Sequence, residues 1–268
     1  MRKDDIGSSV TALQRQLNTA GFKLPTSGLF DAATEAAVIA FQKRAGLVVD
    51  GVAGQKTRAA LAGFANPKLL SEADLMKAAE RLGVSLAALK AVNQVESNGH
   101  GFLPDGRPVI LYERHIAYRL LKERDRDPDA IEDRFTNLVC QKRGGYTGGT
   151  GEWARLSSAR QILFDTPGIP EESCSWGQFQ IMGYHWQAIG YASIDAFVTE
   201  MEASEGAQLL AFIRFIEADP ALHKALKSRK WPEFARLYNG PAYKENLYDV
   251  KLARAFERFS STAEPVPE

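Results

Sequence analysis

The sequence predicts a mainly α-helical protein of two domains: a small three-helix domain at residues 1–66, then a larger helical domain with a small β element at residues 67–268. Three observations support this prediction. Apolar residues recur at intervals of three and four along most of the chain, the spacing of one helix face. A short internal repeat marks the N-terminal part as a separate unit. One run, Val109–Tyr112, has the length and residue types of a strand.

The charge balance limits the classes of partner. Lys plus Arg and Asp plus Glu both number 33 in 268 residues, so the formal net charge is zero. Proteins that bind nucleic acid usually carry a basic excess. The composition therefore argues against a nucleic-acid partner and is otherwise that of an ordinary folded protein.

The repeat joins residues 28–38 to residues 51–61 at an offset of 23, so that Gly28 aligns with Gly51 and Thr34 with Thr57. Each copy is a glycine turn, a short polar segment and the start of an amphipathic helix. Neither copy buries its apolar face alone, whereas two copies can share one core. With an earlier helix at residues 8–20, they predict a compact three-helix unit.

The second domain begins after Asn66-Pro67, because proline disfavours helix at the preceding residue. Ser71 and Ser85 are placed to cap the first two helices. Further helical patterns follow at residues 155–165, 177–190, 194–203, 206–218, 220–229, 232–238 and 242–260.

Glu96 is the residue whose position points to chemistry. It lies seven residues after Leu89 and four after Val92, so all three share one helix face. Desolvation and the negative end of the helix dipole both raise the pKa of a carboxyl there. A carboxyl that is protonated near neutrality is what a glycosidase needs as its general acid. Spacing alone also allows a surface glutamate, or a buried one paired with arginine.

The N-terminal segments resemble a known wall-binding module. VTALQRQLNTAGF, GLFDAATEAAVIAFQKRAGL and VDGVAGQKTRAAL together resemble the three-helix type of peptidoglycan-binding domain found on many wall hydrolases. The resemblance covers residues 8–62 and includes both glycine turns. It implies that bacterial peptidoglycan is the partner of this domain.

Three later segments resemble lysozyme-like enzymes. SWGQFQIMG at residues 175–183 and LYNG at residues 237–240 resemble segments of lytic transglycosylases and goose-type lysozymes. VESNGHGFLPDGRPVILYERH at residues 95–115 resembles the catalytic segment of the N-acetylmuramidase family common among phage endolysins of Gram-negative hosts. The resemblance implies a lysozyme-like fold for the second domain, with Glu96 as general acid.

The resemblance also implies a second carboxylate nine residues after Glu96, where Asp105 stands. Such a group could position water or stabilise the oxocarbenium-like transition state. Pro104-Asp105-Gly106 is also a favourable turn, in which aspartate is common for local hydrogen bonding. Glu113 is a weaker alternative, because it precedes Arg114 and could simply pair with an arginine.

Five residues are candidates for binding the sugar. Gln180, Tyr238 and Asn239 follow from the resemblance, and the two amides could bind N-acetyl or hydroxyl groups. Tyr146 and Trp176 could stack on sugar faces, although aromatic residues are more often part of the core.

Other chemistries find little support. The four histidines lack the spacing of a zinc site, and we expect neither a metal nor a cofactor. Cys140 and Cys174 are expected to be unpaired thiols. The glycine-rich run at residues 144–151 lacks the ending of a phosphate-binding loop, so it is either a lid over the cleft or a plain surface loop.

Together these features predict a monomeric endolysin that hydrolyses the β-1,4 bond between N-acetylmuramic acid and N-acetylglucosamine. A lytic transglycosylase cutting the same bond, or a non-catalytic wall-binding or virion protein, are the alternatives. No signal peptide and no run of roughly 18 apolar residues is evident, so membrane insertion is not expected. We expect synthesis in the host cytoplasm and action on the wall in the periplasm after a holin-like protein permeabilises the membrane.

Overall fold

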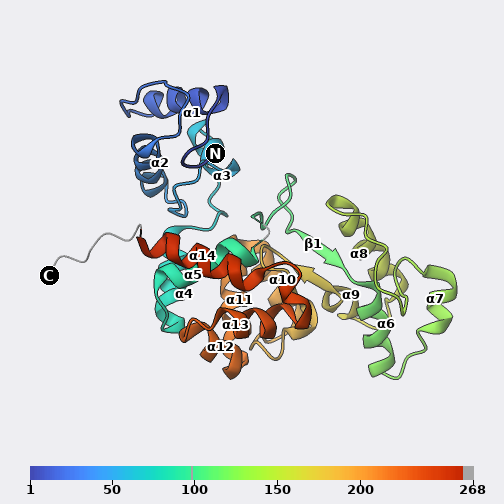
Figure 1. Cartoon of the computed structure of the whole chain (residues 1–268). Coiled ribbons are helices and arrows are strands. Elements are labelled where there is room, and N and C mark those ends of the chain that lie inside the picture. Colours follow the sequence, from blue (N-terminus) through green and yellow to red (C-terminus); the bar gives the residue numbers. More distant parts are fainter. Residues whose placement is uncertain (98, 262–268) are drawn as a thin grey trace. The chain divides into compact units, whose positions relative to one another are not determined.

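The computed structural model describes residues 1–97 and 99–261. These fall into two compact units, Met1–Lys77 and the described part of the chain from Ala78 onward (Figure 1). The described residues contain fourteen α-helices and one three-stranded antiparallel sheet, so the predicted mainly helical fold class is confirmed. Asn66-Pro67 lies between α3 (Gln55–Leu61) and α4 (Glu72–Leu82), and the domain boundary placed there stays a prediction.

The first unit contains α1 (Ser8–Thr19), α2 (Ala32–Arg44) and α3, the three helices that the sequence predicts. Its core is built from one apolar face of each of the first two helices together with side chains from the glycine turns. The buried members are Val10, Leu13, Leu17, Phe30, Ala37, Val38, Phe41 and Ala53.

A buried glutamine organises the first glycine turn. The Gln14 side chain donates from Nε2 to the Leu29 carbonyl at 2.9 Å and to Thr34 Oγ1 at 3.1 Å. Its Oε1 accepts from the Gly28 N–H at 3.0 Å. Gly28 has a φ of 77°, a left-handed conformation that glycine adopts without strain.

Gln42 repeats this arrangement at the second turn. Its Nε2 donates to the Val52 carbonyl and to Thr57 Oγ1, both at 3.1 Å, and its Oε1 accepts from Gly51 N–H at 3.0 Å. The repeat seen in the sequence is therefore a repeat of hydrogen-bonded turns. In each turn, the aligned glycine and threonine bond to the same buried amide.

The second unit is larger and carries most of the helices. After α4 come α5 (Leu86–Glu96), α6 (Arg114–Glu123), α7 (Asp129–Phe135), α8 (Thr150–Ile162), α9 (Ile169–Glu172), α10 (Ile194–Ala203), α11 (Glu205–Ala218), α12 (Pro220–Lys227), α13 (Trp231–Asn239) and α14 (Tyr248–Ser261). The patterns that predict helices at the positions of α10 to α13 are confirmed to within about two residues.

One predicted helix is wrong. Residues 177–190 form a turn, the short strand β3 (Ile181–Met182) and a 3₁₀ turn, η1 (Gly183–His185). The backbone turns at Gly177 and Gln180, whose φ angles of 70° and 51° are incompatible with a right-handed helix.

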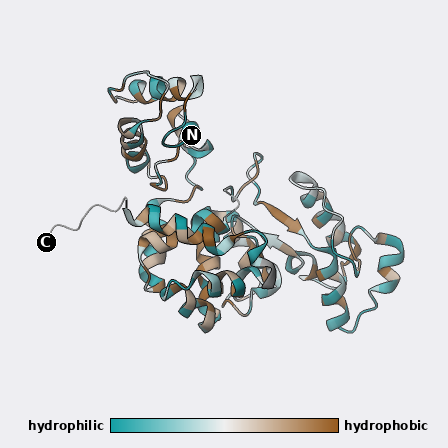
Figure 2. Cartoon of the chain, in the orientation of Figure 1, coloured by the Kyte–Doolittle hydropathy of each residue, from teal (hydrophilic) through white to brown (hydrophobic). Residues whose placement is uncertain are grey.

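The sheet joins three short strands in the order of the chain. β1 (Ile110–Tyr112) lies within the predicted strand and pairs antiparallel with β2 (Cys174–Trp176), with Ile110 opposite Trp176. β2 pairs antiparallel with β3. Figure 2 shows β1 coloured as hydrophobic, in keeping with the burial of Ile110 and Tyr112.

Two features of the second unit position the candidate site. α5 packs along α14, with Ala91, Ala255 and Phe259 buried between them, so the end of α5 is fixed in place. The turn between β2 and β3 brings a second group of side chains to the same region. Within the described residues, no helix has the length and apolarity to span a membrane.

Candidate active site

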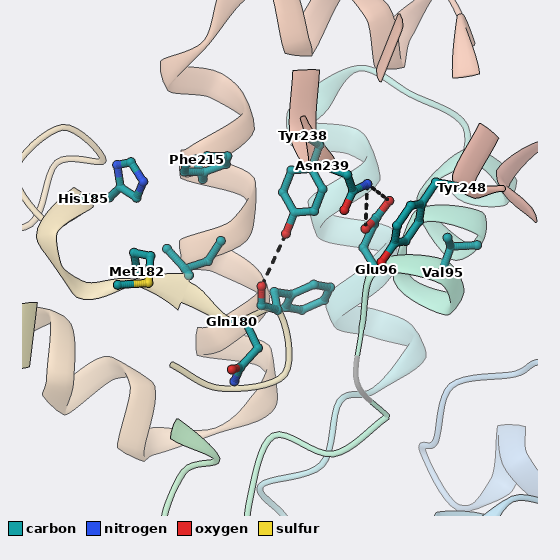
Figure 3. Close-up of a pocket in the computed structure, with 11 residues that line it drawn as sticks. Val95, Glu96, Gln180, Met182, His185, Phe215, Tyr238, Asn239 and Tyr248 are labelled. Atoms are coloured by element: carbon teal, nitrogen blue, oxygen red, sulfur yellow. Dashed lines mark hydrogen bonds between the residues drawn. The ribbon is translucent and has the colours of Figure 1, made fainter. Parts of the chain in front are cut away.

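A cleft of about 330 Å³ lies at the end of α5 (Figure 3). The side chains around it come from α5, the β2–β3 turn, β3, η1, α11, α13 and α14. They are Val95, Glu96, Phe179, Gln180, Ile181, Met182, His185, Phe215, Tyr238, Asn239 and Tyr248. Sequence segments more than 140 residues apart therefore meet at one opening, since α5 and α13 both contribute to it.

Glu96 is the last residue of α5 and, among the described side chains that line this cleft, the one carboxylate. It is half-buried, and Leu89 and Val92 on the same helix face are fully buried. Burial raises the pKa of Glu96 from 4.5 to about 7, although the hydrogen bond from Asn239 and the charge of Lys251 oppose the shift. Glu96 is thus protonated in a large fraction of molecules near neutral pH, as a general acid must be.

This raised pKa predicts a pH-dependent gain in stability for Glu96→Gln. The folded state binds the proton more tightly than the unfolded chain, so Glu96 destabilises the fold as the pH rises from 4.5 through about 7. The gain in the free energy of unfolding should be larger at pH 8 than at pH 5 by about 2 kcal/mol. Urea unfolding at both pH values measures it, and an equal gain at both would contradict the assigned burial.

Tyr238 and Asn239 at the end of α13 lie beside Glu96. The Asn239 Nδ2 donates to Glu96 Oε1 at 3.1 Å and to Oε2 at 3.3 Å. The Tyr238 hydroxyl turns inward and donates to the Phe179 carbonyl at 3.3 Å. Burial, and then the nearby Glu96, raise the pKa of Tyr238, so this phenol stays neutral.

Gln180 lines the cleft, but its amide is engaged in the turn. Its Oε1 accepts from the Ser175 hydroxyl at 2.8 Å, and its Nε2 donates to the Gly177 carbonyl at 2.8 Å. Figure 3 shows the amide pointing away from Glu96. These bonds stabilise the left-handed backbone that places Phe179 and Ile181 in the cleft.

Three cleft residues lie outside every sequence segment that carries the family resemblance: His185, Phe215 and Tyr248. The ring of His185 packs edge-on against Phe215 with the centroids 5.1 Å apart. Burial, and then the charge of Arg119, lower the pKa of His185, so its imidazole is neutral near pH 7. No motif marks these positions, because only the packing of η1, α11 and α14 brings them together.

Asp105 is not among the residues that line this cleft. It lies on an exposed turn, in which Gly106 N–H donates to the Leu103 carbonyl at 2.9 Å. Arg107 binds its carboxylate from Nη2 at 2.7 Å, and this hydrogen bonding lowers the pKa of Asp105. The local-turn interpretation accounts for Asp105 in this position.

Tyr146 and Glu113 form a separate cluster outside the cleft lining. The Tyr146 hydroxyl donates to Glu113 Oε2 at 2.7 Å, and Arg143 Nε donates to that hydroxyl at 2.9 Å. Arg143 also pairs with the buried Glu113 carboxylate at 3.3 Å. The alternative that Glu113 serves only to pair with an arginine therefore fits, although the partner is Arg143 and not Arg114.

Trp176 belongs to the core and not to a sugar-binding surface. Its side chain is 0% exposed, its Nε1 donates to the Glu171 carbonyl at 3.0 Å, and its ring meets Trp153 and Phe197 edge-on. No face of the ring is free to stack on a sugar. Of the two interpretations of Trp176, its burial supports the core one.

The buried carboxylate of Glu152 binds backbone N–H groups of the glycine-rich run at residues 144–151. Thr147 N–H and Gly148 N–H donate to Glu152 Oε1 at 2.6 and 2.9 Å, while Glu152 Oε2 pairs with Arg155 at 2.7 Å. Burial would raise the pKa of Glu152, but these N–H groups, Tyr112 N–H and Arg155 together hold it below its usual range. These contacts favour a fixed surface loop over a mobile lid.

Within the described part of the chain, the cysteines form no bridge and the metal-ligating side chains form no cluster. Cys140 and Cys174 are both unpaired and buried, as predicted. Among residues 1–97 and 99–261, no group of three His, Cys, Asp or Glu side chains is arranged to hold a metal ion.

Comparison with known proteins assigns both units. Residues 85–260 match the N-acetylmuramidase family, and residues 6–61 match a peptidoglycan binding domain. The crystal structure of a Burkholderia AP3 phage endolysin is 54% identical, with a TM-score of 0.92, over 98% of this chain and 99% of that one. The N-acetylmuramoyl-L-alanine amidase CwlL of Bacillus licheniformis is 44% identical over 71 residues, which are 25% of this chain and 20% of the relative.

Proposed function

We propose that this chain, which belongs to the N-acetylmuramidase family, hydrolyses bacterial peptidoglycan with Glu96 as the general acid. Like a modular phage endolysin, the chain carries a peptidoglycan-binding domain in front of the muramidase domain. The bond is the β-1,4 linkage between N-acetylmuramic acid and N-acetylglucosamine. The observation that carries the proposal is a half-buried carboxyl in the cleft with its pKa raised to about 7.

In the proposed mechanism, Glu96 protonates the glycosidic oxygen as the bond from that oxygen to the anomeric carbon breaks. The electron pair of the bond stays on the departing oxygen. Water adds to the anomeric carbon and gives one proton to a carboxylate, either Asp105 or the ionised Glu96, from which the acid form of Glu96 is restored. The rings of Tyr238 and Phe215 form apolar walls for the sugar, and Asn239 is the cleft amide closest to the acid. Gln180, which lines the cleft, and Tyr146, which lies outside the cleft lining, remain proposed sugar contacts.

Asp105 is the proposed second carboxylate. Its place nine residues after Glu96 supports this role, and the hydrogen bonds from Arg107 keep it ionised, as a group that orients water must be. Because it lies outside the cleft lining, the role requires the turn to approach the bound sugar. Replacing Asp105 therefore tests whether the enzyme needs two carboxylates or works with Glu96 alone.

Asp105→Asn is expected to lower kcat/KM on peptidoglycan at least tenfold, because an amide cannot stabilise positive charge at the anomeric carbon. Rates of release of dye-labelled fragments measure this effect. The matched control is Asp133→Asn, which neutralises another exposed aspartate of the same unit. Activity of Asp105→Asn equal to that of the control would remove Asp105 from the mechanism.

Product analysis tests the proposed reaction. Purified Gram-negative peptidoglycan is digested with the whole protein or its Glu96→Gln variant, and the fragments are identified by mass spectrometry. Muramic acid with reducing ends, absent with the variant, supports hydrolysis. Products lighter by one water would instead identify a lytic transglycosylase, an alternative favoured by the single carboxylate in the cleft lining. Binding without any fragments would leave a wall-binding protein.

We propose that the N-terminal domain keeps the enzyme on its insoluble substrate. Tethering raises the effective concentration of glycan at the cleft without adding a catalytic contact. The chain is proposed to act as a monomer on the wall in the periplasm, after a holin-like partner permeabilises the membrane.

A further inference from the structure

Two helices end at the same point in the cleft. α5 ends at Glu96, and α13 ends at Asn239. The chain leaves α13 through Gly240, whose φ of 78° is a conformation that glycine tolerates and most residues do not. This turn leaves Asn239 at the cleft with its side chain directed at Glu96 (Figure 3).

The contact engages the amide nitrogen of Asn239. Nδ2 lies 3.1 and 3.3 Å from the two oxygens of Glu96, within donating distance of both. A donor that faces a carboxyl favours its charged form. The same donor restricts rotation of the carboxyl, because both oxygens are tied to one nitrogen.

Asn239 is held by a rigid neighbour. The preceding residue, Tyr238, stacks on Phe234 at an interplanar angle of 10° and meets Phe212 edge-on at 5.5 Å. Its hydroxyl bonds to the Phe179 carbonyl on the other side of the cleft. The end of α13 is therefore fixed from two directions, and Asn239 is presented to Glu96 in a defined position.

The other titratable groups around Glu96 are Tyr238 from α13 and Tyr248 from α14, which line the same cleft, and Lys251 from α14, whose charge acts on it. His185 from η1 lines the cleft farther from Glu96 (Figure 3). Burial raises the pKa of Tyr238, so its phenol is neutral near pH 7, and burial lowers the pKa of His185, so its imidazole is neutral there. Lys251 acts through its charge, without a hydrogen bond to Glu96 in the described residues. Among the residues that the structure describes, Asn239 is thus the polar group that donates a hydrogen bond to the acid.

We propose that Asn239 is a positioning residue, which orients the carboxyl of Glu96 and stabilises the carboxylate that remains after the proton has moved to the glycosidic oxygen. This inference rests on the proposed function of Glu96. It gives the Asn239 amide nitrogen a role toward the acid in place of the sugar contact implied by the family resemblance. It also makes Asn239 a determinant of the pH above which activity is lost.

The test is the pH profile of kcat/KM for two variants, since that profile reports the titration of the free enzyme. Asn239→Leu removes the donor and should move the alkaline limb upward by about one pH unit. Asn239→Asp is nearly isosteric and places a second carboxylate beside Glu96, so the shift should be at least as large. Asn137→Asp adds the same charge at an exposed position of the same unit and should leave the limb unchanged.

A second measurement follows the protonation of the Glu96 carboxyl directly and does not depend on enzyme activity. Carbon-13 NMR titration of the Glu96 carboxyl in the full chain should show the same upward shift in both Asn239 variants. If Asn239→Leu does not fold, Asn239→Asp alone decides the outcome. A midpoint and alkaline limb equal to those of the unmodified protein would overturn the inference. Full activity of Glu96→Gln would instead refute the proposed function, so the two failures are distinguishable.

Discussion

Glu96→Gln is expected to reduce the rate of peptidoglycan cleavage by about 10²- to 10⁴-fold, the usual contribution of a positioned general acid. Glutamine keeps the shape of the side chain and can still contact Asn239, but it has no proton to donate at neutral pH. The departing sugar must then leave as an unprotonated alkoxide. Binding to the wall should be unchanged, because the binding domain is a separate unit.

Initial rates on purified peptidoglycan from pH 5 to pH 9 measure this effect. The unmodified enzyme should lose activity as the pH rises past about 7, where Glu96 loses its proton, and the residual activity of the variant should lack this limb. Glu257→Gln, an exposed glutamate on α14, is the matched control. A Glu96→Gln variant within a few-fold of this control would exclude Glu96 as the acid.

Glu152→Gln is expected to be the second large effect, a loss of about 3–5 kcal/mol in the free energy of unfolding of the catalytic unit. Glu152 is fully buried and pairs with Arg155, whose side chain is 5% exposed. The carbonyls of Tyr112 and Asn137 also accept from Arg155, but they cannot neutralise its charge. Removing the carboxylate leaves a buried cation and weakens the bonds that hold the glycine-rich loop.

Thermal and urea unfolding, followed by circular dichroism, measure this loss. The exposed pair of Arg119 and Glu123 provides the control, because Glu123→Gln should change stability by less than about 1 kcal/mol. Adding Arg155→Met to Glu152→Gln should recover part of the loss, since the double variant buries no charge. A single variant as stable as the Glu123→Gln control would show that the pair contributes nothing to the fold.

Periodic segments of the fold were predictable, and segments set by single backbone angles were not. The helices α10 to α13 have regular apolar faces, and the first three have clear caps at Ser193, Ser204 and Asp219. The residues around Gly177 carry a helix-like pattern, yet the left-handed backbone at Gly177 and Gln180 converts them into a strand and turn. The glycine can be read from the sequence, but the pairing of β2 with β3 that selects its φ angle forms only in the folded protein.

The candidate site divides in the same way. The position of Glu96 follows from its helix face, and the family resemblance supplies Tyr238 and Asn239, which line the same cleft. Trp176 and Tyr146 have the right chemistry for a sugar, but local sequence does not show whether a ring is buried or bonded elsewhere. His185 and Tyr248 reach the cleft through packing between distant elements, and no local spacing could reveal that.

The paired glutamines of the first unit have a consequence for how that domain can vary. Gln14 and Gln42 bind their turns through a backbone carbonyl, a glycine N–H and a threonine hydroxyl, with the side chains of Ser27 and Asp50 as further partners. The side chains displayed at Leu29 and Val52 take no part in these bonds. Leu29 is displayed in this way, 41% exposed on the first turn, and Val52 occupies the matching place on the second. The exposed residue of either turn can therefore be substituted independently of the other, without disturbing the hydrogen bonds that Gln14 and Gln42 make.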